Sequence, residues 1–131
     1  MNPLSQYQKD MSIEEVLNAR VISWPLTLPM CSPISDGAAA AVLCTRDALR
    51  RFDEARAIKV YATVLASSAN RAPDEVEKGI TRLAAVKAYN QAGLGPNDMS
   101  VAEVHDATAF AEIAQSEYLG FCEFGDGGPM A

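Results

Sequence analysis

The chain has 131 residues, of which 49% are hydrophobic and 21% are charged, with a formal net charge of −6. This length allows one domain or part of a larger one, and the apolar content excludes a disordered chain. An acidic chain gains nothing from counterion release on a phosphate backbone, which argues against a nucleic-acid partner. No apolar run approaches the roughly 20 residues of a membrane span, and we expect no signal peptide from the polar start. Three widely separated cysteines suggest no disulfide framework, which favours a reducing, cytoplasmic setting.

The first predicted element is a short helix. Ser12 and Glu15 have the spacing of a capping box, which predicts a helix that ends near Asn18. Three prolines then interrupt the apolar stretch at residues 21–35. Proline lacks the donor and the freedom that a helix or a central strand requires, so we expect an extended, largely buried loop there.

Two stretches in the middle of the chain have patterns typical of regular structure. Residues 38–44 are small and apolar, and periodicity leaves open whether they form a buried strand or a helix. Thr45 can cap a short helix that runs to Phe52. Residues 58–64 alternate between apolar and polar side chains, which is the period of a half-buried strand.

The second half of the chain predicts two longer helices and one more strand. Pro73, followed by acidic residues, suits the first turn of a helix that reaches Gln91, with Gly93 as its left-handed end. A strand is expected over residues 101–104, and a further helix ends at Gly120. The remaining tail is rich in glycine and has no regular period.

The order of these elements predicts the fold class. A strand, a helix, another strand and another helix follow one another, with connections of ordinary length. Such an order is typical of α/β proteins in which at least two strands are parallel. We therefore expect an α/β fold of layered strands and helices.

The sharpest candidate for chemistry is the pair His105 and Asp106, because it follows the predicted strand and precedes a helix. In open α/β sheets, ligands bind at the carboxyl ends of strands, and the amino terminus of a helix favours negative charge. His105 can donate a hydrogen bond to a developing oxyanion, while Asp106 caps the helix or orients the ring. The alternative is a capping aspartate beside a histidine that has no catalytic role.

The cysteines and serines give weaker signals. Cys31 and Cys122 can be interpreted as nucleophiles, but neither belongs to a CxxC pair, and cysteine is commonly a buried structural residue. We therefore expect Cys31 and Cys44 to be buried and Cys122, near the tail, to be more open. One histidine and scattered thiols do not form a zinc site, so no metal is expected. Ser32 lacks the GxSxG turn of a hydrolase.

Two motifs resemble those of thiolases. MCSPISDGAAAAVL, residues 30–43, resembles the thiolase segment in which a small-residue loop runs into Asp-Gly-Ala-Ala-Ala. VAEVHDATAF, residues 101–110, resembles the strand-to-helix motif that most thiolases write with Asn-Glu-Ala-Phe. Its His-Asp version is similar to the sterol carrier protein X-type thiolases and the bacterial lipid-transfer-protein-like thiolases. The resemblance also extends to residues 2–7 and 117–122, and so covers essentially the whole chain.

The resemblance implies a partial thiolase fold. Residues 1–35 correspond to the end of the loop domain, residues 36–56 to the last strand and helix of the amino-terminal half, and residues 57–131 to a truncated start of the carboxyl-terminal half. The nucleophilic cysteine, the Gly-His-Pro histidine and the second catalytic cysteine of thiolases match nothing in this chain. Cys31 and Cys122 correspond to neither catalytic cysteine.

The resemblance also implies an activity and its residues. The whole protein is expected to be an acyl-CoA acyltransferase of lipid metabolism, which performs Claisen condensation or thiolytic cleavage of 3-oxoacyl-CoA. These 131 residues alone are expected to be inactive. His105 takes the place of the oxyanion-hole residue, with Asp106 beside it, and Ser32 falls where the family has a serine near the pantetheine arm of coenzyme A.

The same resemblance sets the expected partners. A coenzyme A thioester is the expected substrate, with no permanently bound cofactor. The protein is expected to be a homo-oligomer, and association with a small partner subunit stays open. Two other functions stay open. One is a retro-aldolase of the lipid-transfer-protein type that acts on steroid side-chain CoA thioesters. The other is a non-catalytic acyl- or lipid-binding or assembly module.

Overall fold

The structure is a computed structural model that describes residues 3–67 and 70–131. Within that part of the chain, most of the regular structure is helical, and the one sheet is a two-stranded antiparallel hairpin. Short 3-10 turns lie at Leu28–Met30, Glu54–Arg56, Val76–Lys78 and Pro96–Asp98. The helices and strands, in chain order, are α1 (Ile13–Leu17), β1 (Val21–Ser23), β2 (Leu26–Thr27), α2 (Arg46–Leu49), α3 (Ile80–Ala92), α4 (Ala109–Leu119) and α5 (Gly127–Met130).

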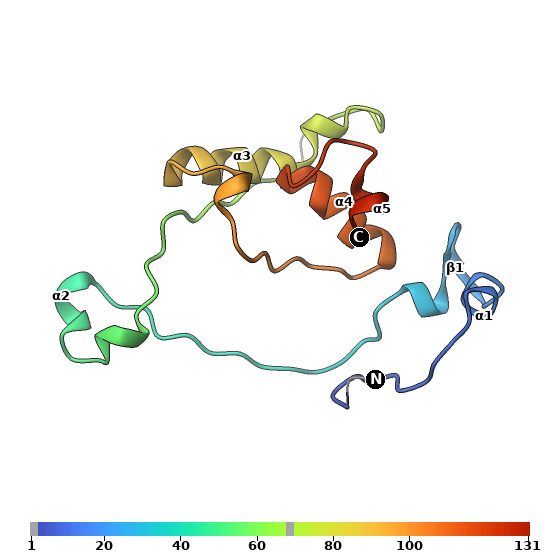
Figure 1. The fold of residues 1–131 in the computed structure, drawn as a ribbon, viewed down its shortest axis with the longest axis horizontal. Coiled ribbons are helices and arrows are strands. Elements are labelled where there is room, and N and C mark those ends of the chain that lie inside the picture. The colour runs from blue at the N-terminus through green and yellow to red at the C-terminus, as the bar shows by residue number, and fades with distance from the viewer. Residues whose placement is uncertain (1–2, 68–69) are drawn as a thin grey trace.

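Helices α3 and α4 lie against each other and form the best-packed part of the molecule (Figure 1). The Tyr89 hydroxyl on α3 donates a hydrogen bond of 2.9 Å to the carbonyl oxygen of Leu119 at the end of α4. Ala85, on α3, is only 7% exposed. Both helices end at a glycine in the left-handed conformation, Gly93 with a φ of 69° and Gly120 with a φ of 79°. The predicted ends of both helices are therefore confirmed.

The start of α3 differs from the prediction. Pro73 does not open the helix, because a turn and a 3-10 segment precede it and α3 begins only at Ile80. Gly79, immediately before the helix, has an extended ψ of 139° and is buried. A Cβ at this position would meet the Tyr118 ring of α4 at 3.0 Å. The close approach of α4 therefore explains a glycine and a break in the helix at this point.

The glycine-rich tail is held by one carboxylate and one ring. Glu117 Oε1 accepts hydrogen bonds of 3.0 Å from the amides of Gly125 and Gly127. The Tyr118 and Phe124 rings meet edge to face, with centroids 6.0 Å apart. The tail then ends in the single turn of α5. These side-chain contacts order the segment, and they produce no periodic pattern in the sequence from which its structure could be predicted.

The amino-terminal region confirms one prediction and corrects another. The capping box of α1 is present: the Glu15 amide donates to Ser12 Oγ at 3.1 Å, and the Ser12 amide donates to Glu15 Oε2 at 2.8 Å. The stretch at 21–35, expected to be a buried loop, instead begins with the β1–β2 hairpin, and much of it is exposed. Trp24, 86% exposed, lies at the turn of that hairpin, beside a cis bond to Pro25.

The two predicted strands, at residues 58–64 and 101–104, are wrong in this structure, and residues 38–44, for which a strand or a helix was expected, form neither. Residues 38–44, 58–64 and 101–104 are extended, but they pair with no strand in the described part of the chain. Residues 38–44 are not a helix either. A strand completes its hydrogen bonds only against a neighbour, and the expected parallel pairing therefore does not occur here. Figure 1 shows these segments as long arms, with α2 at the far end of one of them.

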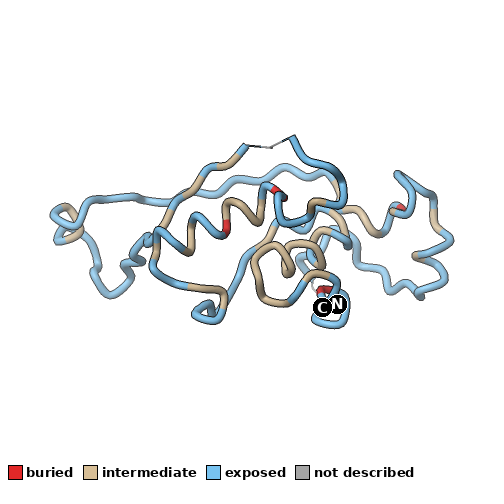
Figure 2. The backbone as a smooth tube through the Cα atoms, turned by 90° about the horizontal axis from the view of Figure 1, so that it is seen from above, coloured by how far each residue is buried: buried red, intermediate tan, exposed pale blue. Residues whose placement is uncertain are grey.

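Burial is correspondingly low over the described residues (Figure 2). Two glycines, Thr27 and Ala85 are the buried residues there, so no large side chain is buried in the described part of the chain. Large apolar side chains such as Ile34 (99% exposed) and Leu65 (95% exposed) face solvent. No helix over residues 3–67 and 70–131 is long and apolar enough to cross a bilayer. Helices with one small sheet are consistent with a partial α/β fold rather than a complete one.

Candidate functional site

Two segments that are far apart in the sequence meet at Ser32. The Ser32 amide donates a hydrogen bond of 3.0 Å to the carbonyl oxygen of Ala107, and the Ser32 hydroxyl donates one of 2.9 Å to the same oxygen. Next to this contact, Cys31 and Thr108 form an isolated antiparallel bridge. The loop that follows β2 is thereby joined to the turn that precedes α4.

An open pocket of about 280 Å³ lies at this crossing, and we call it the crossing pocket. It contains two carboxylates, Asp106 and Glu112, and no basic side chain. The Ser32 and Thr108 hydroxyls and the Cys31 thiol belong to its lining as well. The complete lining is Tyr7, Pro29, Met30, Cys31, Ser32, Pro33, Asp106, Thr108, Ala109 and Glu112.

The structure brings two of the three predicted site residues into this pocket. Ser32 and Asp106 line it, while His105 is the residue immediately before Asp106 and is exposed. The N-cap residue of α4 is Thr108, and no side chain caps this end of the helix. Asp106 therefore lies near the amino terminus of α4, as expected, but it is not the cap. It remains available to interact with the neighbouring His105 ring or with a ligand.

The crossing pocket is suited to a polar ligand without negative charge, because it offers hydroxyl and thiol groups beside two carboxylates. Hydroxyl and thiol groups can exchange hydrogen bonds with amides and carbonyls. The two carboxylates repel phosphate groups, because no Arg or Lys of the lining offsets them. Within the described ranges, no group of three or more His, Cys, Asp or Glu residues could hold a metal ion.

The cysteines differ from their predicted burial. Cys31 is half-buried and Cys44 is exposed, so the expectation that both are buried is wrong, because the extended arm that carries Cys44 has no covering layer. Cys122 is half-buried, and burial together with the negative charges of Glu117, Asp126 and Glu123 raises the pKa of its thiol. A raised pKa lowers the thiolate fraction at neutral pH, which argues against a nucleophilic role for Cys122.

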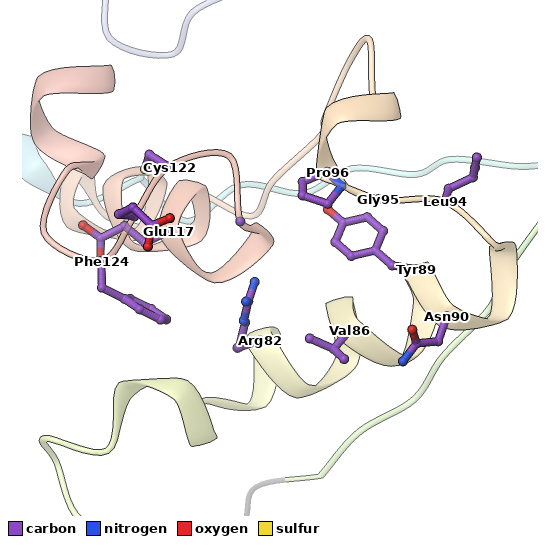
Figure 3. Close-up of a pocket in the computed structure, with 12 residues that line it drawn as sticks. Arg82, Val86, Tyr89, Asn90, Leu94, Gly95, Pro96, Glu117, Cys122 and Phe124 are labelled. Atoms are coloured by element: carbon purple, nitrogen blue, oxygen red, sulfur yellow. The ribbon is translucent and has the colours of Figure 1, made fainter.

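A second pocket, of about 320 Å³, lies between α3 and the segments that flank α4 (Figure 3). The Arg82 side chain extends from α3 into the space between Glu117 and Tyr89, which line the same pocket. Burial raises the pKa of the Tyr89 hydroxyl, which therefore stays protonated and continues to donate to the α4 carbonyl. This pocket contains none of the predicted site residues. It is the larger of the two, but two of the three predicted site residues, Ser32 and Asp106, line the crossing pocket.

Sequence reasoning identified both segments of the site but not the contact between them. The motifs at 30–43 and 101–110 contain all the polar atoms of the Ser32–Ala107 contact. Their pairing over 75 residues has no periodic signal, because it involves one backbone carbonyl and one hydroxyl. Tyr7 and Glu112, which complete the pocket, carried no motif of their own.

Comparison with known proteins shows several related sequences. The family model described as "Thiolase C-terminal domain-like" matches residues 62–131. The benzoylsuccinyl-CoA thiolase subunit BbsB of Thauera aromatica is 38% identical over 128 residues, which is 96% of this chain and 33% of the relative. An acetyl-CoA acetyltransferase of Methanothermobacter thermautotrophicus is 37% identical over 132 residues, 97% of this chain and 34% of the relative.

Sterol carrier protein 2 of Oryctolagus cuniculus is 34% identical over 136 residues, which is 98% of this chain and 25% of the relative. The chain thus spans about a third or less of the length of these relatives. The family model covers more than half of the chain, and the relatives cover nearly all of it. These matches confirm the resemblance and the partial α/β fold class. The chain belongs to the thiolase family, with the thiolase C-terminal-like domain in its second half.

Proposed function

We propose that this chain supplies the oxyanion-stabilising segment of an acyltransferase that cleaves or forms 3-oxoacyl-CoA thioesters. The observation that carries the proposal is the crossing at Ser32 and Ala107, which joins the two thiolase-like motifs into one site beside His105. The family match supports the same reading. In this proposal residues 1–35, 36–56 and 57–131 are parts of a loop domain and of two thiolase halves.

The proposed role of His105 is to donate a hydrogen bond to the thioester carbonyl oxygen. That oxygen gains negative charge when the adjacent carbon becomes an enolate, in either direction of the reaction. Asp106 is proposed to orient the His105 ring, which would fix the nitrogen that carries the donated proton. Both side chains lie just before the amino terminus of α4, whose dipole favours the same negative charge.

The crossing pocket is proposed to hold the uncharged part of the coenzyme A thioester. Its hydroxyls can bond to the amides of a pantetheine arm, and Ser32 is the proposed contact. Its carboxylates disfavour the nucleotide phosphates, which would then lie outside the pocket. Asp106 and Glu112 thus set the direction in which a CoA thioester enters.

The chain alone is proposed to be inactive. Claisen chemistry on a thioester needs a nucleophilic thiolate and a base, and the only histidine of the chain is His105. We expect no release of free thiol from acetoacetyl-CoA above a blank when the 131 residues are assayed alone. A measurable burst of product from the chain would overturn this part of the proposal.

The oxyanion role is tested in a chimaera in which residues 1–131 replace the matching third of the Methanothermobacter acetyl-CoA acetyltransferase. His105→Ala should lower kcat about 10²- to 10³-fold, the usual cost of one oxyanion donor. His105→Asn should retain more activity because the amide still donates. Affinity for CoA should change little in both variants, because the donated bond forms mainly in the transition state.

Two further measurements keep this test decisive. Circular dichroism and thermal unfolding of each chimaera separate a folding defect from a catalytic one. Equal activity of the Ala and Asn variants with the unchanged chimaera would refute the role of His105. Cleavage of a steroid side-chain 3-hydroxyacyl-CoA without thiolysis would instead favour the retro-aldolase alternative.

A further inference from the structure

The hydrogen bonds at Ser32 converge on one atom. Both the amide and the hydroxyl of Ser32 lie within 3.0 Å of the Ala107 carbonyl oxygen, at 3.0 and 2.9 Å. A carbonyl oxygen only accepts, so the hydroxyl proton must point towards it. The two lone pairs of the Ser32 oxygen then remain free. Ser32 can therefore hold the protein backbone and accept a hydrogen bond from a ligand at the same time.

The segment that Ser32 holds has little other support. Residues 99–107 follow an extended course, and most of them are exposed. Within the described part of the chain, residues 100–107 take part in two hydrogen bonds, and Ser32 donates both. Thr108, which follows, is joined to Cys31 by the isolated bridge. Apart from its covalent link to α4, this segment is therefore held by the crossing.

His105 lies two residues before the carbonyl that Ser32 holds. Only two peptide units separate the imidazole from the fixed point, so loss of that point changes the position of the ring directly. A donor that stabilises a transition state must be held within about 0.5 Å of its productive place. A shift of about 1 Å can cost on the order of 10²-fold in rate.

We propose that Ser32 is a positioning residue for His105. Its hydroxyl, by donating to the Ala107 carbonyl oxygen, fixes the turn between His105 and α4 and so directs the imidazole towards the thioester carbonyl. This inference rests on the proposed oxyanion role of His105. It adds to Ser32 a task that contact with the substrate alone would not include.

The first test uses the 131-residue chain itself, in which His105 is the only histidine. Its imidazole nitrogen signals can therefore be assigned without ambiguity by NMR. Ser32→Ala should shift the Ala107 carbonyl resonance, broaden the His105 signals and lower the order parameters of residues 103–108. Ser32→Thr, which keeps a hydroxyl, should restore them. Ser35→Ala, an exposed serine of the same loop, is the matched control and should change none of them.

The second test separates positioning from substrate contact in the acetyltransferase chimaera. Ser32→Ala should lower kcat about ten- to hundredfold, in addition to the rise in KM that loss of a pantetheine contact causes, and Ser32→Thr should recover most of the loss in kcat. In a His105→Ala background, Ser32→Ala should lower kcat almost no further, because both changes remove the same transition-state stabilisation.

The outcomes distinguish the two proposals. If His105→Ala is harmless, the proposed function fails, whatever Ser32 does. If His105→Ala lowers kcat while Ser32→Ala leaves kcat and the His105 signals unchanged, the positioning role is refuted. A rise in KM for CoA alone would show that Ser32 contacts substrate without positioning His105. Independent, multiplicative losses in the double variant would also overturn the positioning role.

Discussion

The α3–α5 region and the arm formed by residues 36–66 differ in how far their backbone and side chains find partners within the chain. In the first region, α3 and α4 share the Tyr89–Leu119 hydrogen bond, and Glu117 ties the tail to α4. In the arm, α2 is one short turn, and its flanking segments are extended and mostly exposed. Both regions belong to one chain that is 49% hydrophobic.

The difference shows how helices and strands depend on their surroundings. A helix forms its backbone hydrogen bonds within four residues, so α3 and α4 can form from local sequence alone. A strand needs another strand at its side, and residues 58–64 have an alternating pattern with no partner among the described residues. Along the arm, Ala62, Val64 and Ala66 are half-buried while the residues between them are exposed. The alternation of a strand is therefore retained without its sheet.

The largest expected effect is association through the arm. Ile58 (89% exposed), Val60 (64%) and Leu65 (95%) present apolar surface and free backbone groups, which tend to be covered by another chain. We expect the 131-residue chain to form dimers or larger species, measured by light scattering over a range of concentrations. A stable monomer at high concentration would contradict this.

A matched pair of variants locates the associating surface. Replacing Ile58 and Val60 by Thr keeps the branched shape but removes apolar area, and it should shift the chain towards monomer. The same replacement at Val86, 40% exposed on α3, should leave association unchanged. If only the α3 variant dissociates the chain, the associating surface lies in the helical region instead.

The next largest effect concerns the tail of the helical region. A Cβ on Gly127 would lie 2.5 Å from the Ile113 carbonyl oxygen, so Gly127→Ala should destabilise this region by about 1–3 kcal/mol. Gly128, also in α5, has nothing within 4 Å of an added Cβ. Gly128→Ala should therefore be neutral or slightly stabilising. Thermal unfolding followed by circular dichroism measures both, and equal melting temperatures would show that the tail is not packed as described.

A smaller effect should link Glu117 to Cys122. Glu117→Gln removes the charge from the acceptor of two amides and should cost about 1 kcal/mol. It also removes one of the negative charges that raise the pKa of the Cys122 thiol. That pKa should fall towards its ordinary value, which increases the thiolate fraction at a given pH.

Alkylation of Cys122 by iodoacetamide, followed by mass spectrometry over a pH series, measures this shift. The midpoint for the native chain should lie above that for the urea-denatured chain, and Glu117→Gln should lower it. Glu112→Gln, on the same helix, is the control, because Glu112 is not among the causes of the raised pKa. A midpoint that Glu117→Gln leaves unchanged would show that this carboxylate does not act on the thiol.

The parts of the fold that the sequence predicts correctly are those that depend on residues close together in the chain. The capping box at Ser12 and Glu15 and the left-handed ends at Gly93 and Gly120 were predicted from sequence and are present. The strands were not, because a two-residue period shows that one face prefers burial but not whether a partner exists. The predicted start of α3 was wrong because the Tyr118 ring, distant in sequence, packs against Gly79 and leaves no room for a Cβ there.

The sequence identified the residues of the candidate site but not the contacts between them. His105, Asp106 and Ser32 were selected from strand ends, helix starts and motif resemblance. That the Ser32 hydroxyl bonds to the Ala107 carbonyl could not be deduced, because a carbonyl exists at every position of the backbone. The cap at Thr108 rather than Asp106 depends on where α4 begins, which sequence patterns locate only to within a few residues.

The smallest expected effect is the pH dependence of α1, a helix outside both regions that is stabilised by its capping box. The Ser12 amide and the nearby Lys9 ammonium lower the pKa of Glu15, so its carboxylate is favoured in the folded helix. A lowered pKa in the folded state means that this stabilisation is present above the ordinary pKa of glutamate and is lost as the pH falls through the folded value. Backbone chemical shifts of α1 should therefore move towards coil on acidification. Glu15→Gln should remove much of this dependence, whereas Glu14→Gln should preserve it, since the Glu14 carboxylate has no part in the capping box. Identical titrations in both variants would show that α1 depends on its contacts with the Leu28–Met30 turn rather than on its cap.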